Sequence, residues 1–457
     1  RVVGVDPPAG GRSSGTELPR HLPADTRMAF VMVQHLAPGH KSMMTELLAR
    51  ETILDVSEVT DGMKLKPNHV DVIPPNTNLG IFKNALHLMP RETKGQHLPI
   101  DYFFQSLAKE RDSKAIGVIL SGSASDGTLG MKAIKAEDGV TFAQSPETAH
   151  YAGMPVSAID AGCVDFVLPP EDIAAELVHI ARHPAVLRTD LVAGKEERER
   201  IDGELEKIFW LLRNRTGNDF TYYKTCSSQR RISRRMLVHK IERLKDYVRY
   251  VGSHPDELDA LFQDILINVT SFFRDPEAFS VLKNKVFPML VLERSRQHPI
   301  RIWVPGCSTG EAVYSIIMTL IEFLGDDMSG TPIQVFASDI DEQAIARARA
   351  AIYPEGIVAE VSRERLQRFF TKVPQGYQIN KRLRDLCVFA EQNIAKDPPF
   401  SHQDLIACRN MMIYMSTPLQ RKVLQTMHYA LNPGGYLFLG TSETVGASAD
   451  LFAVEDE

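Results

Sequence analysis

Arg301-Ile-Trp-Val-Pro-Gly-Cys-Ser-Thr-Gly-Glu311 is the stretch that decides the fold of the second half of the chain. An apolar run of strand length leads into two glycines, and helical spacing follows from Glu311 to Leu324. Gly306 and Gly310 let the main chain pass close to a ligand, and the start of the helix presents free N–H donors. The next predicted strand ends at Ala337-Ser-Asp339-Ile-Asp341, where an acid can accept hydrogen bonds from ribose hydroxyls. The pattern predicts a nucleotide-binding type of sheet.

The spacing of the two glycines favours methyl transfer over hydride transfer. Residues 306–311 follow GxxxGE and not GxGxxG, so the turn is not shaped for a pyrophosphate. Either Asp339 or Asp341 could bind the ribose, and the residues alone leave both open.

Composition sets the class of protein. The chain has 457 residues, of which 44% are hydrophobic, and this is enough for two or three domains with real cores. No apolar run approaches the roughly 20 residues of a membrane helix, and no signal peptide pattern is present, so we expect no membrane insertion and a cytoplasmic location. Both ends of the chain look cut from something longer. The five cysteines form no CxxC pair, which argues against a zinc site and a disulfide framework.

The predicted fold class is α/β, with two doubly wound parallel sheets. In the first half, apolar runs of strand length alternate with helical spacing, which is typical of parallel βαβ units. Its predicted strands are 2–5, 29–36, 115–122 and 140–143, and its predicted helices are 41–50 and 128–136. In the second half the predicted strands are 300–304, 333–338, 386–389, 405–408 and 436–439, with helices at 311–324 and 342–351.

Four parts follow one another along the chain. Residues 1–183 form the first α/β domain, and the almost wholly charged run at 195–200 indicates a solvated linker over 184–200. Residues 201–265 have helical periodicity without strand signals, which predicts a small all-helical subdomain. Residues 266–457 form the second α/β domain. It carries a small β insertion at about 353–389, predicted from Phe369-Phe370 and Gly376-Tyr-Gln-Ile379.

Five motifs of the second half stand in a fixed order. They are Asn268-Val-Thr270-Ser-Phe-Phe-Arg274-Asp, Gly306-Cys-Ser-Thr-Gly-Glu311, Ser338-Asp-Ile-Asp341, Asn393 ahead of Asp397-Pro-Pro-Phe400, and Cys408-Arg409-Asn410-Met-Met-Ile-Tyr414. Together, over residues 215–450, they resemble the chemotaxis receptor methyltransferase family, CheR type. The resemblance implies S-adenosylmethionine as cofactor. The cofactor-binding residues that it implies are Asn268, Thr270, Arg274, Glu311, Asp339, Asp341, Asn393, Ile394, Arg409 and Asn410.

The resemblance also implies a reaction, the methylation of glutamate side chains on chemoreceptors. A glutamate carboxylate is ionised near neutral pH and can attack a sulfonium methyl, so such an enzyme needs alignment and charge handling more than a general base. Arg274 and Arg409 could provide both. In the family the β insertion docks a tethering peptide of some receptors, and that role stays open here.

A basic helix, Gln229-Arg-Arg-Ile-Ser-Arg-Arg-Met236, precedes these motifs. Most charge runs are solvated faces. In the resembling family, however, the equivalent helix faces the glutamate-rich helical bundle of a chemoreceptor cytoplasmic domain, which implies electrostatic steering of the substrate. The candidate substrate-binding residues are Arg230, Arg231, Arg234 and Arg235. Binding of RNA or DNA is the competing interpretation, and it ranks lower because no aromatic platform interleaves the arginines.

The first half has three motifs of its own, Gln34-His35-Leu36, Ser121-Gly-Ser-Ala-Ser-Asp126-Gly-Thr128 and Met154-Pro-Val-Ser-Ala158. They resemble the protein-glutamate methylesterase family, CheB type, over residues 1–180. That family hydrolyses receptor methyl esters with a serine, a histidine and an aspartate, and His35 and Asp126 match the last two.

The serine of that triad has no counterpart. The family pattern Gly-Ala-Ser-x-Gly-Gly aligns with Asp6-Pro7-Pro8-Ala9-Gly10-Gly11, so Pro8 stands at the nucleophile position. Proline supplies neither a nucleophile nor an N–H group. Ser13 and Ser14 follow closely, but a nucleophile shifted by five or six residues would spoil the triad geometry. Pro8 is either a true loss or a sequence error.

Three hypotheses follow. The first is an active glutamate methyltransferase fused to an impaired or silent methylesterase-like domain. The resemblance to fused proteins of this order implies further sensory modules in the full-length chain. The second is a non-catalytic sensory signalling scaffold, favoured by Pro8 and disfavoured by the intact cofactor motifs. The third is an RNA methyltransferase, which predicts binding that falls steeply with salt.

Overall fold

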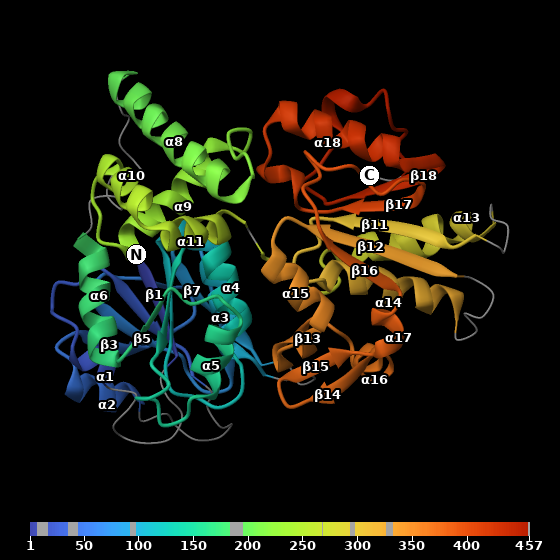
Figure 1. Cartoon of the computed structure of the whole chain (residues 1–457). Helices are drawn as coiled ribbons and strands as arrows, with labels where there is room; N and C mark the ends of the chain where they lie inside the picture. Colours follow the sequence, from blue (N-terminus) through green and yellow to red (C-terminus); the bar gives the residue numbers. More distant parts are fainter. Residues whose placement is uncertain are drawn as a thin grey trace. The chain divides into compact units, whose positions relative to one another are not determined.

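The computed structural model describes residues 1–6, 17–34, 44–91, 97–182, 195–266, 268–292, 298–325 and 332–455. It has two compact units. The first unit comprises Arg1–Ile208 with Gln229–Glu257, and the second comprises Phe209–Ser228 with Leu258–Glu457. Each unit has its own parallel sheet with helices on both faces (Figure 1), which confirms the predicted fold class.

The sheet of the first unit has the strand order β10-β9-β8-β1-β2-β5-β3, and every neighbouring pair is parallel. Its strands are β1 (Val2–Asp6), β2 (Ala29–Met32), β3 (Asp55–Glu58), β5 (His69–Val72), β8 (Ala115–Ile119), β9 (Val140–Gln144) and β10 (Phe166–Leu168). Its helices are α1 (Glu17–Arg20), α2 (Met44–Glu51), α3 (Pro99–Arg111), α4 (Thr128–Ala136), α5 (Gly153–Asp160) and α6 (Pro170–Arg182).

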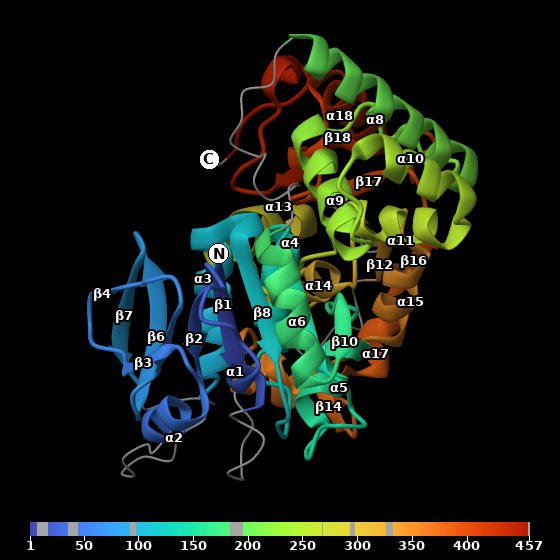
Figure 2. The same cartoon turned by 90° about the vertical axis from the view of Figure 1, so that its left-hand side faces the viewer.

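The period of two along these strands places successive side chains in different cores. Val2 packs in the cluster that α3, α4 and α5 cover, while Val3 and Val5 pack in the cluster covered by α1, α2 and α6. Figure 2 shows α1 and α6 on the viewer's side of this sheet. A strand buried on both faces is apolar throughout, which is why these runs are readable from the sequence.

A second, antiparallel sheet in this unit was not predicted. It consists of β4 (Met63–Lys64), β6 (Thr77–Phe82) and β7 (Ala85–Pro90) in the order β4-β7-β6. Lys83 and Asn84 form the two-residue turn between β6 and β7, with φ of 48° and 64°. Two consecutive positive φ angles match the twist of a tight hairpin, but Lys at the first position gives a weak sequence signal.

The sheet of the second unit has the order β16-β12-β11-β17-β18, again with parallel neighbours. Its strands are β11 (Ile300–Pro305), β12 (Ile333–Asp339), β16 (Cys387–Glu391), β17 (Gln403–Cys408) and β18 (Leu431–Leu439). Its helices include α12 (Pro276–Val281), α13 (Phe287–Leu292), α14 (Glu311–Leu324), α15 (Glu342–Ala350), α16 (Arg363–Phe369), α17 (Lys381–Arg384) and α18 (Thr417–Ala430). The predicted insertion is a small antiparallel sheet of β13 (Ile352–Tyr353), β14 (Phe370–Val373) and β15 (Gly376–Ile379).

The segment predicted as a helical subdomain is helical but divided between the units. Its helices are α8 (Lys195–Thr216), α9 (Thr225–Val238), α10 (Leu244–Ser253) and α11 (Pro255–Ile265). Residues 229–257, which hold most of α9 and all of α10, group with the first unit, whereas 258–265 group with the second. Helix α8 begins at Lys195, inside the linker predicted for residues 184–200. The predicted domain boundaries remain predictions.

Candidate active site

The glycine turn after β11 is held in a conformation that glycine favours. Gly306 and Gly310 have φ of 66° and 93°, and Gly310 precedes the first residue of α14. A Cβ atom on Gly306 would lie 2.7 Å from Sδ of Met411, so a side chain there would displace the segment after β17. The Ser308 N–H donates to the Asp339 carboxylate at 2.8 Å. The turn is thereby fixed against the end of the neighbouring strand.

The two acids at the end of β12 have different partners. Asp339 accepts backbone N–H groups of Ser308 and Asp341, at 2.8 and 3.1 Å. Burial raises the pKa of Asp339, and these amide bonds oppose that rise. Asp341 is 1% exposed and caps α15 by accepting the Gln343 N–H at 2.9 Å.

Asn268 connects Asp341 to the glycine turn. Its amide Nδ2 donates to the Asp341 carboxylate, and its Oδ1 accepts the Ser308 hydroxyl at 3.2 Å. Gln263 of α11 also reaches Asp341, at 3.4 Å. The structure therefore joins Asn268, Asp339 and Asp341 in one hydrogen-bonded network around the turn.

Glu311 is buried at the amino terminus of α14, with 4% exposure. Its carboxylate accepts the Thr309 hydroxyl at 2.7 Å, and the positive end of the helix dipole favours its charge. The Tyr353 hydroxyl donates to the Thr309 carbonyl at 2.8 Å. Burial raises the pKa of Tyr353, and the nearby Glu311 raises it further. The β insertion thus contacts this turn through Tyr353.

Asn393 and Ile394 follow β16, beside the end of β12. The Gln392 N–H donates to the Asp339 carbonyl at 2.9 Å, which ties the two strand ends. Asn393 donates from Nδ2 to Asn218 at 2.7 Å, and Ile394 is 8% exposed in the apolar cluster around Trp303. Both residues lie at the carboxyl edge of the sheet, where ligands of this fold bind.

The two motif arginines differ in environment. The Arg409 guanidinium is 5% exposed, donates to the Arg274 carbonyl at 2.7 Å and pairs with Asp275 at 2.7 Å. It lies 5.3 and 4.8 Å from the ring centroids of Phe279 and Phe438, and burial lowers its pKa. Arg274 is exposed. Its side chain makes no hydrogen bond or ion pair with other residues of the described ranges. Arg409 holds the segment that presents Arg274, because it binds the main-chain carbonyl of that residue.

Asn410 and Thr270 complete the predicted set. Asn410 has a φ of 59°, and its N–H donates to the Glu443 carboxylate at 2.7 Å. Glu443 also accepts the Met412 N–H at 2.7 Å and thereby shapes the turn after β17. Thr270 is half-buried ahead of Phe273, whose N–H donates to the Ser315 hydroxyl of α14 at 3.0 Å.

Sequence reasoning missed several residues that support this site, namely Asn218, Tyr223, Gln263, Asp275 and Glu443. Burial raises the pKa of Tyr223 to about 12, with Asp339 adding to the rise. Asn218 and Tyr223 lie far from the motifs in the sequence. No short-range pattern indicates them, because tertiary folding alone brings them to the strand ends.

The chemistry of these side chains fits S-adenosylmethionine. Buried carboxylates at Glu311 and Asp341 can accept from hydroxyl and ammonium groups, and the amides of Asn268 and Asn393 can donate and accept. The side-chain amides on Asp341 can be exchanged for ligand donors without unfolding a turn. An acid-rich edge of this kind suits a positively charged sulfonium compound and not a phosphate.

In the first unit, Asp126 follows β8 and is 2% exposed. It accepts the backbone N–H groups of Ile100, Asp101 and Gly127, at 3.1, 2.9 and 2.8 Å. Pro8 and His35, together with Ser13 and Ser14, lie outside the described residues. The structure therefore positions only Asp126 of the predicted triad.

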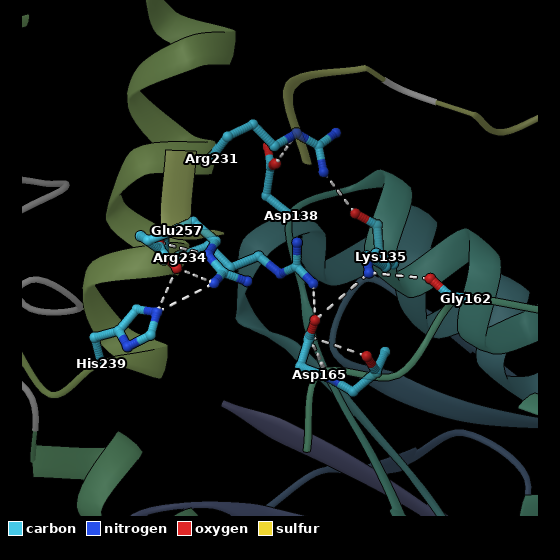
Figure 3. Close-up of polar contacts among 10 residues, drawn as sticks. Lys135, Asp138, Gly162, Asp165, Arg231, Arg234, His239 and Glu257 are labelled. Atoms are coloured by element: carbon cyan, nitrogen blue, oxygen red, sulfur yellow. Dashed lines mark hydrogen bonds and ion pairs between the residues drawn. The ribbon is translucent and has the colours of Figure 1, made fainter. Parts of the chain in front are cut away.

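The four arginines of α9 do not form one solvated face. Arg231 and Arg234 are each 4% exposed and pair with Asp138 and Asp165 of the first unit (Figure 3). Arg235 pairs with Glu257, and Arg230 is exposed. The expectation of an open basic surface is corrected in this respect, because α9 packs on the first unit through this stripe. Their assignment as substrate-binding residues stays a prediction.

No group of three or more His, Cys, Asp or Glu side chains in the described ranges is placed to hold a metal ion. Among the same residues, no helix combines the length and the apolar character that a membrane crossing requires.

Three family models match the chain in succession. Residues 3–177 match the CheB methylesterase model, 203–266 the all-alpha domain of CheR methyltransferases, and 268–457 the SAM binding domain of CheR methyltransferases. The last match identifies the edge described above as part of an S-adenosylmethionine binding domain.

Similar proteins match most of the chain or one of its two parts. An uncharacterized 104.1 kDa protein of Rhodobacter capsulatus is 37% identical over 90% of this chain, which spans 45% of that relative. The crystal structure of the Thermotoga maritima CheB methylesterase catalytic domain is 30% identical, with a TM-score of 0.37, and covers 39% of this chain and 98% of its own. Chemotaxis protein methyltransferase 1 of Pseudomonas aeruginosa is 32% identical over 48% of this chain and 82% of its own length. The chain thus belongs to the CheR family of chemotaxis methyltransferases and carries a CheB-type methylesterase domain ahead of the CheR part.

Proposed function

We propose that the chain transfers a methyl group from S-adenosylmethionine to glutamate side chains of chemoreceptor cytoplasmic domains or similar glutamate-rich helical proteins. The network that joins Asn268, Ser308, Asp339 and Asp341 supports this proposal most directly. It connects three motif segments at the carboxyl edge of one sheet. An edge of this kind is where ligands of this fold bind, which favours the enzyme over the scaffold.

Asp341 is the better candidate for the ribose hydroxyls. Asp339 is engaged by backbone N–H groups that fix the glycine turn, and losing them would open the turn. Asp341 is reached by the side-chain amides of Gln263 and Asn268, which can turn away when a ligand enters.

The reaction needs little proton chemistry. Bound at this edge, S-adenosylmethionine would supply an electrophilic methyl group. The substrate glutamate is already ionised near neutral pH, so the chain's contribution is to align its carboxylate. The exposed Arg274 can bind that carboxylate, while Arg409 holds the main chain of Arg274 in place.

Calorimetric titration of the full chain with S-adenosylmethionine and S-adenosylhomocysteine tests the proposal. We expect micromolar binding that weakens about tenfold to hundredfold in Asp341→Ala, because a hydrogen bond to a charged group contributes about 1.5–3 kcal/mol. Asp385→Ala, at an exposed carboxylate of the same unit, is the matched control and should bind normally. A folded wild-type chain that binds neither compound would contradict the methyltransferase and favour the signalling scaffold.

Transfer to a purified receptor cytoplasmic fragment then tests the substrate. Labelled methyl groups should appear on glutamate and be released by mild base as methanol. Labelled RNA in a parallel reaction would favour the RNA methyltransferase instead. Because such receptor domains are cytoplasmic, we propose that the chain acts in the cytoplasm, and the described cysteines are free thiols, as is usual there. Fused sensory modules stay a prediction.

For the methylesterase-like domain we propose that hydrolysis is lost. The support is Pro8, which stands at the nucleophile position and has no nucleophilic group. The loss concerns that position, because the backbone amides still hold Asp126 in place. Wild-type chain should release no methanol from methylated receptor fragment, and Pro8→Ser should restore release if His35 and Asp126 are otherwise placed for catalysis. Methanol release by the wild type would contradict the loss.

A further inference from the structure

Arg231 and Arg234 bind a defined surface of the first unit. We call it the guanidinium-binding surface: the carboxylates of Asp138 and Asp165 and the carbonyl oxygens of Lys135 and Ala136. Figure 3 shows Arg231 beside Asp138 and Lys135, and Arg234 beside Asp165. Lys135 and Ala136 end α4, Asp138 follows them, and Asp165 precedes β10.

Each arginine has a distinct set of bonds. Arg231 Nε pairs with Asp138 at 2.7 Å, and its two terminal nitrogens donate to the carbonyls of Lys135 and Ala136, both at 2.7 Å. The carbonyls of the last turn of a helix carry the negative end of its dipole, which favours a cation there. Arg234 pairs with Asp165, whose second oxygen accepts the Thr141 N–H and hydroxyl at 3.0 and 2.9 Å.

The contact extends beyond the two ion pairs. Leu237, one helical turn after Arg234, is 3% exposed and packs in the core cluster of α1, α2 and α6. At the rim, Lys240 pairs with Glu176 of α6 at 2.7 Å and remains 55% exposed. Arg231, Arg234 and Leu237 share one stripe of α9, so this face is covered by the methylesterase-like domain.

We propose that the guanidinium-binding surface competes with an acidic helical protein for Arg231 and Arg234, the basic stripe of α9. The identity of that protein as a chemoreceptor rests on the proposed function. Glutamate carboxylates on a receptor bundle offer Arg231 and Arg234 the acceptor chemistry that Asp138 and Asp165 already provide. We call the arrangement in which α9 lies on the guanidinium-binding surface the closed state. In it, only Arg230 of the four arginines is exposed, so receptor binding requires α9 to leave the guanidinium-binding surface.

The energetic form of this competition is a population shift. A partner that binds only the released helix has an apparent affinity reduced by the released fraction. Buried ion pairs with several additional hydrogen bonds hold the closed state, and removing one acceptor leaves a guanidinium without its partner. The methylesterase-like domain therefore regulates substrate access even without hydrolysing anything.

Two measurements on the full chain test the proposal: amide hydrogen exchange over residues 229–238, and affinity for a fluorescent receptor cytoplasmic fragment with glutamate at its methylation positions. In Asp165→Asn we expect exchange to accelerate roughly tenfold and receptor affinity to rise about fivefold. Lys240→Met removes only the rim pair, so it should fold normally and change both quantities less, in the same direction.

Asp246→Asn is the matched control. Asp246 pairs with Arg243 and Arg249 at 2.6 and 3.4 Å on the exposed side of α10, so the same charge change there should alter neither quantity. Unchanged exchange in Asp165→Asn would overturn the proposal, as would receptor affinity that stays equal or falls although exchange has accelerated. Titration with S-adenosylmethionine in the same samples separates the two proposals, because a chain that binds no cofactor contradicts the methyltransferase and leaves the competition standing.

Discussion

The carboxyl edges of the two parallel sheets hold buried acids in different ways. At the edge of the second sheet, Asp341 caps α15 through one backbone N–H, that of Gln343, and is also reached by side-chain amides from Gln263 and Asn268. At the edge of the first sheet, Asp126 is held by three backbone N–H groups, and Asp6 at the end of β1 has one carboxylate oxygen without a hydrogen-bond partner among the described residues.

Asp341 can therefore exchange its side-chain partners for a ligand, whereas the partners of Asp126 are part of the backbone structure. Side-chain amides can be replaced by a ligand, whereas backbone amides at the start of α3 cannot move without breaking the helix. We therefore expect substitutions of side chains that can exchange partners, at the second edge, to change binding and turnover. Substitutions of side chains that hold backbone groups, such as Asp126 and Arg409, should change stability.

Arg274→Ala should lower methyl transfer by about 100-fold to 1000-fold, equivalent to about 3–4 kcal/mol of transition-state stabilisation. The side chain is exposed and free to hold the substrate carboxylate, so cofactor affinity should change less than about threefold. Steady-state kinetics and calorimetry on the same protein check this split. Equal losses in both would place Arg274 in the cofactor site alone.

Arg409→Ala should lower the free energy of unfolding of the second unit by about 2–3 kcal/mol. It removes a buried guanidinium between Phe279 and Phe438 and leaves the Asp275 carboxylate and Arg274 carbonyl without their donor. Urea denaturation measures the loss, and Arg349→Ala, at an exposed arginine with a single hydrogen bond, is the control. Unchanged stability would show that Arg409 does not hold this segment.

Asp126→Asn should destabilise the first unit by about 1–2 kcal/mol, because the new NH2 group would face the Ile100 N–H at 3.1 Å. Binding of S-adenosylmethionine should stay unchanged. A large loss of cofactor binding in this variant would erase the distinction between the two edges.

Asp6→Asn should change the pH dependence of stability by about 1 kcal/mol or more. Burial first, and Asp126 second, raise the pKa of Asp6 well above its ordinary value. The folded chain therefore binds this proton more tightly than the unfolded chain, and stability falls as pH rises from about 4 through the raised pKa. The substitution should leave stability near pH 4 unchanged and increase it above that window.

Urea denaturation at about pH 5 and about pH 8 compares the two chains. A wild-type chain whose stability does not fall relative to Asp6→Asn between these values would contradict a buried, proton-binding Asp6.

Much of the candidate site was predictable from the sequence. Continuous apolar runs indicate the central strands of both sheets, because a strand buried on both faces must be apolar, and the glycine turn at 306–310 indicates the βα turn of the second sheet, because such a turn needs positive φ. The glycine turn after β11 and the acids after β12 then meet because the ends of neighbouring parallel strands share one edge, and Asn268 reaches them from the segment between α11 and α12.

Only the tertiary structure decided what α9 contacts. The helical period places Arg231 and Arg234 on one stripe, but it does not say which element covers that stripe. Their acceptors lie far away along the chain: the carbonyls of Lys135 and Ala136 are 96 and 95 residues from Arg231, and Asp165 is 69 residues from Arg234. A local pattern carries no information about such distant partners. The arginines of α9 become buried only after both α9 and the segments that hold their acceptors have folded.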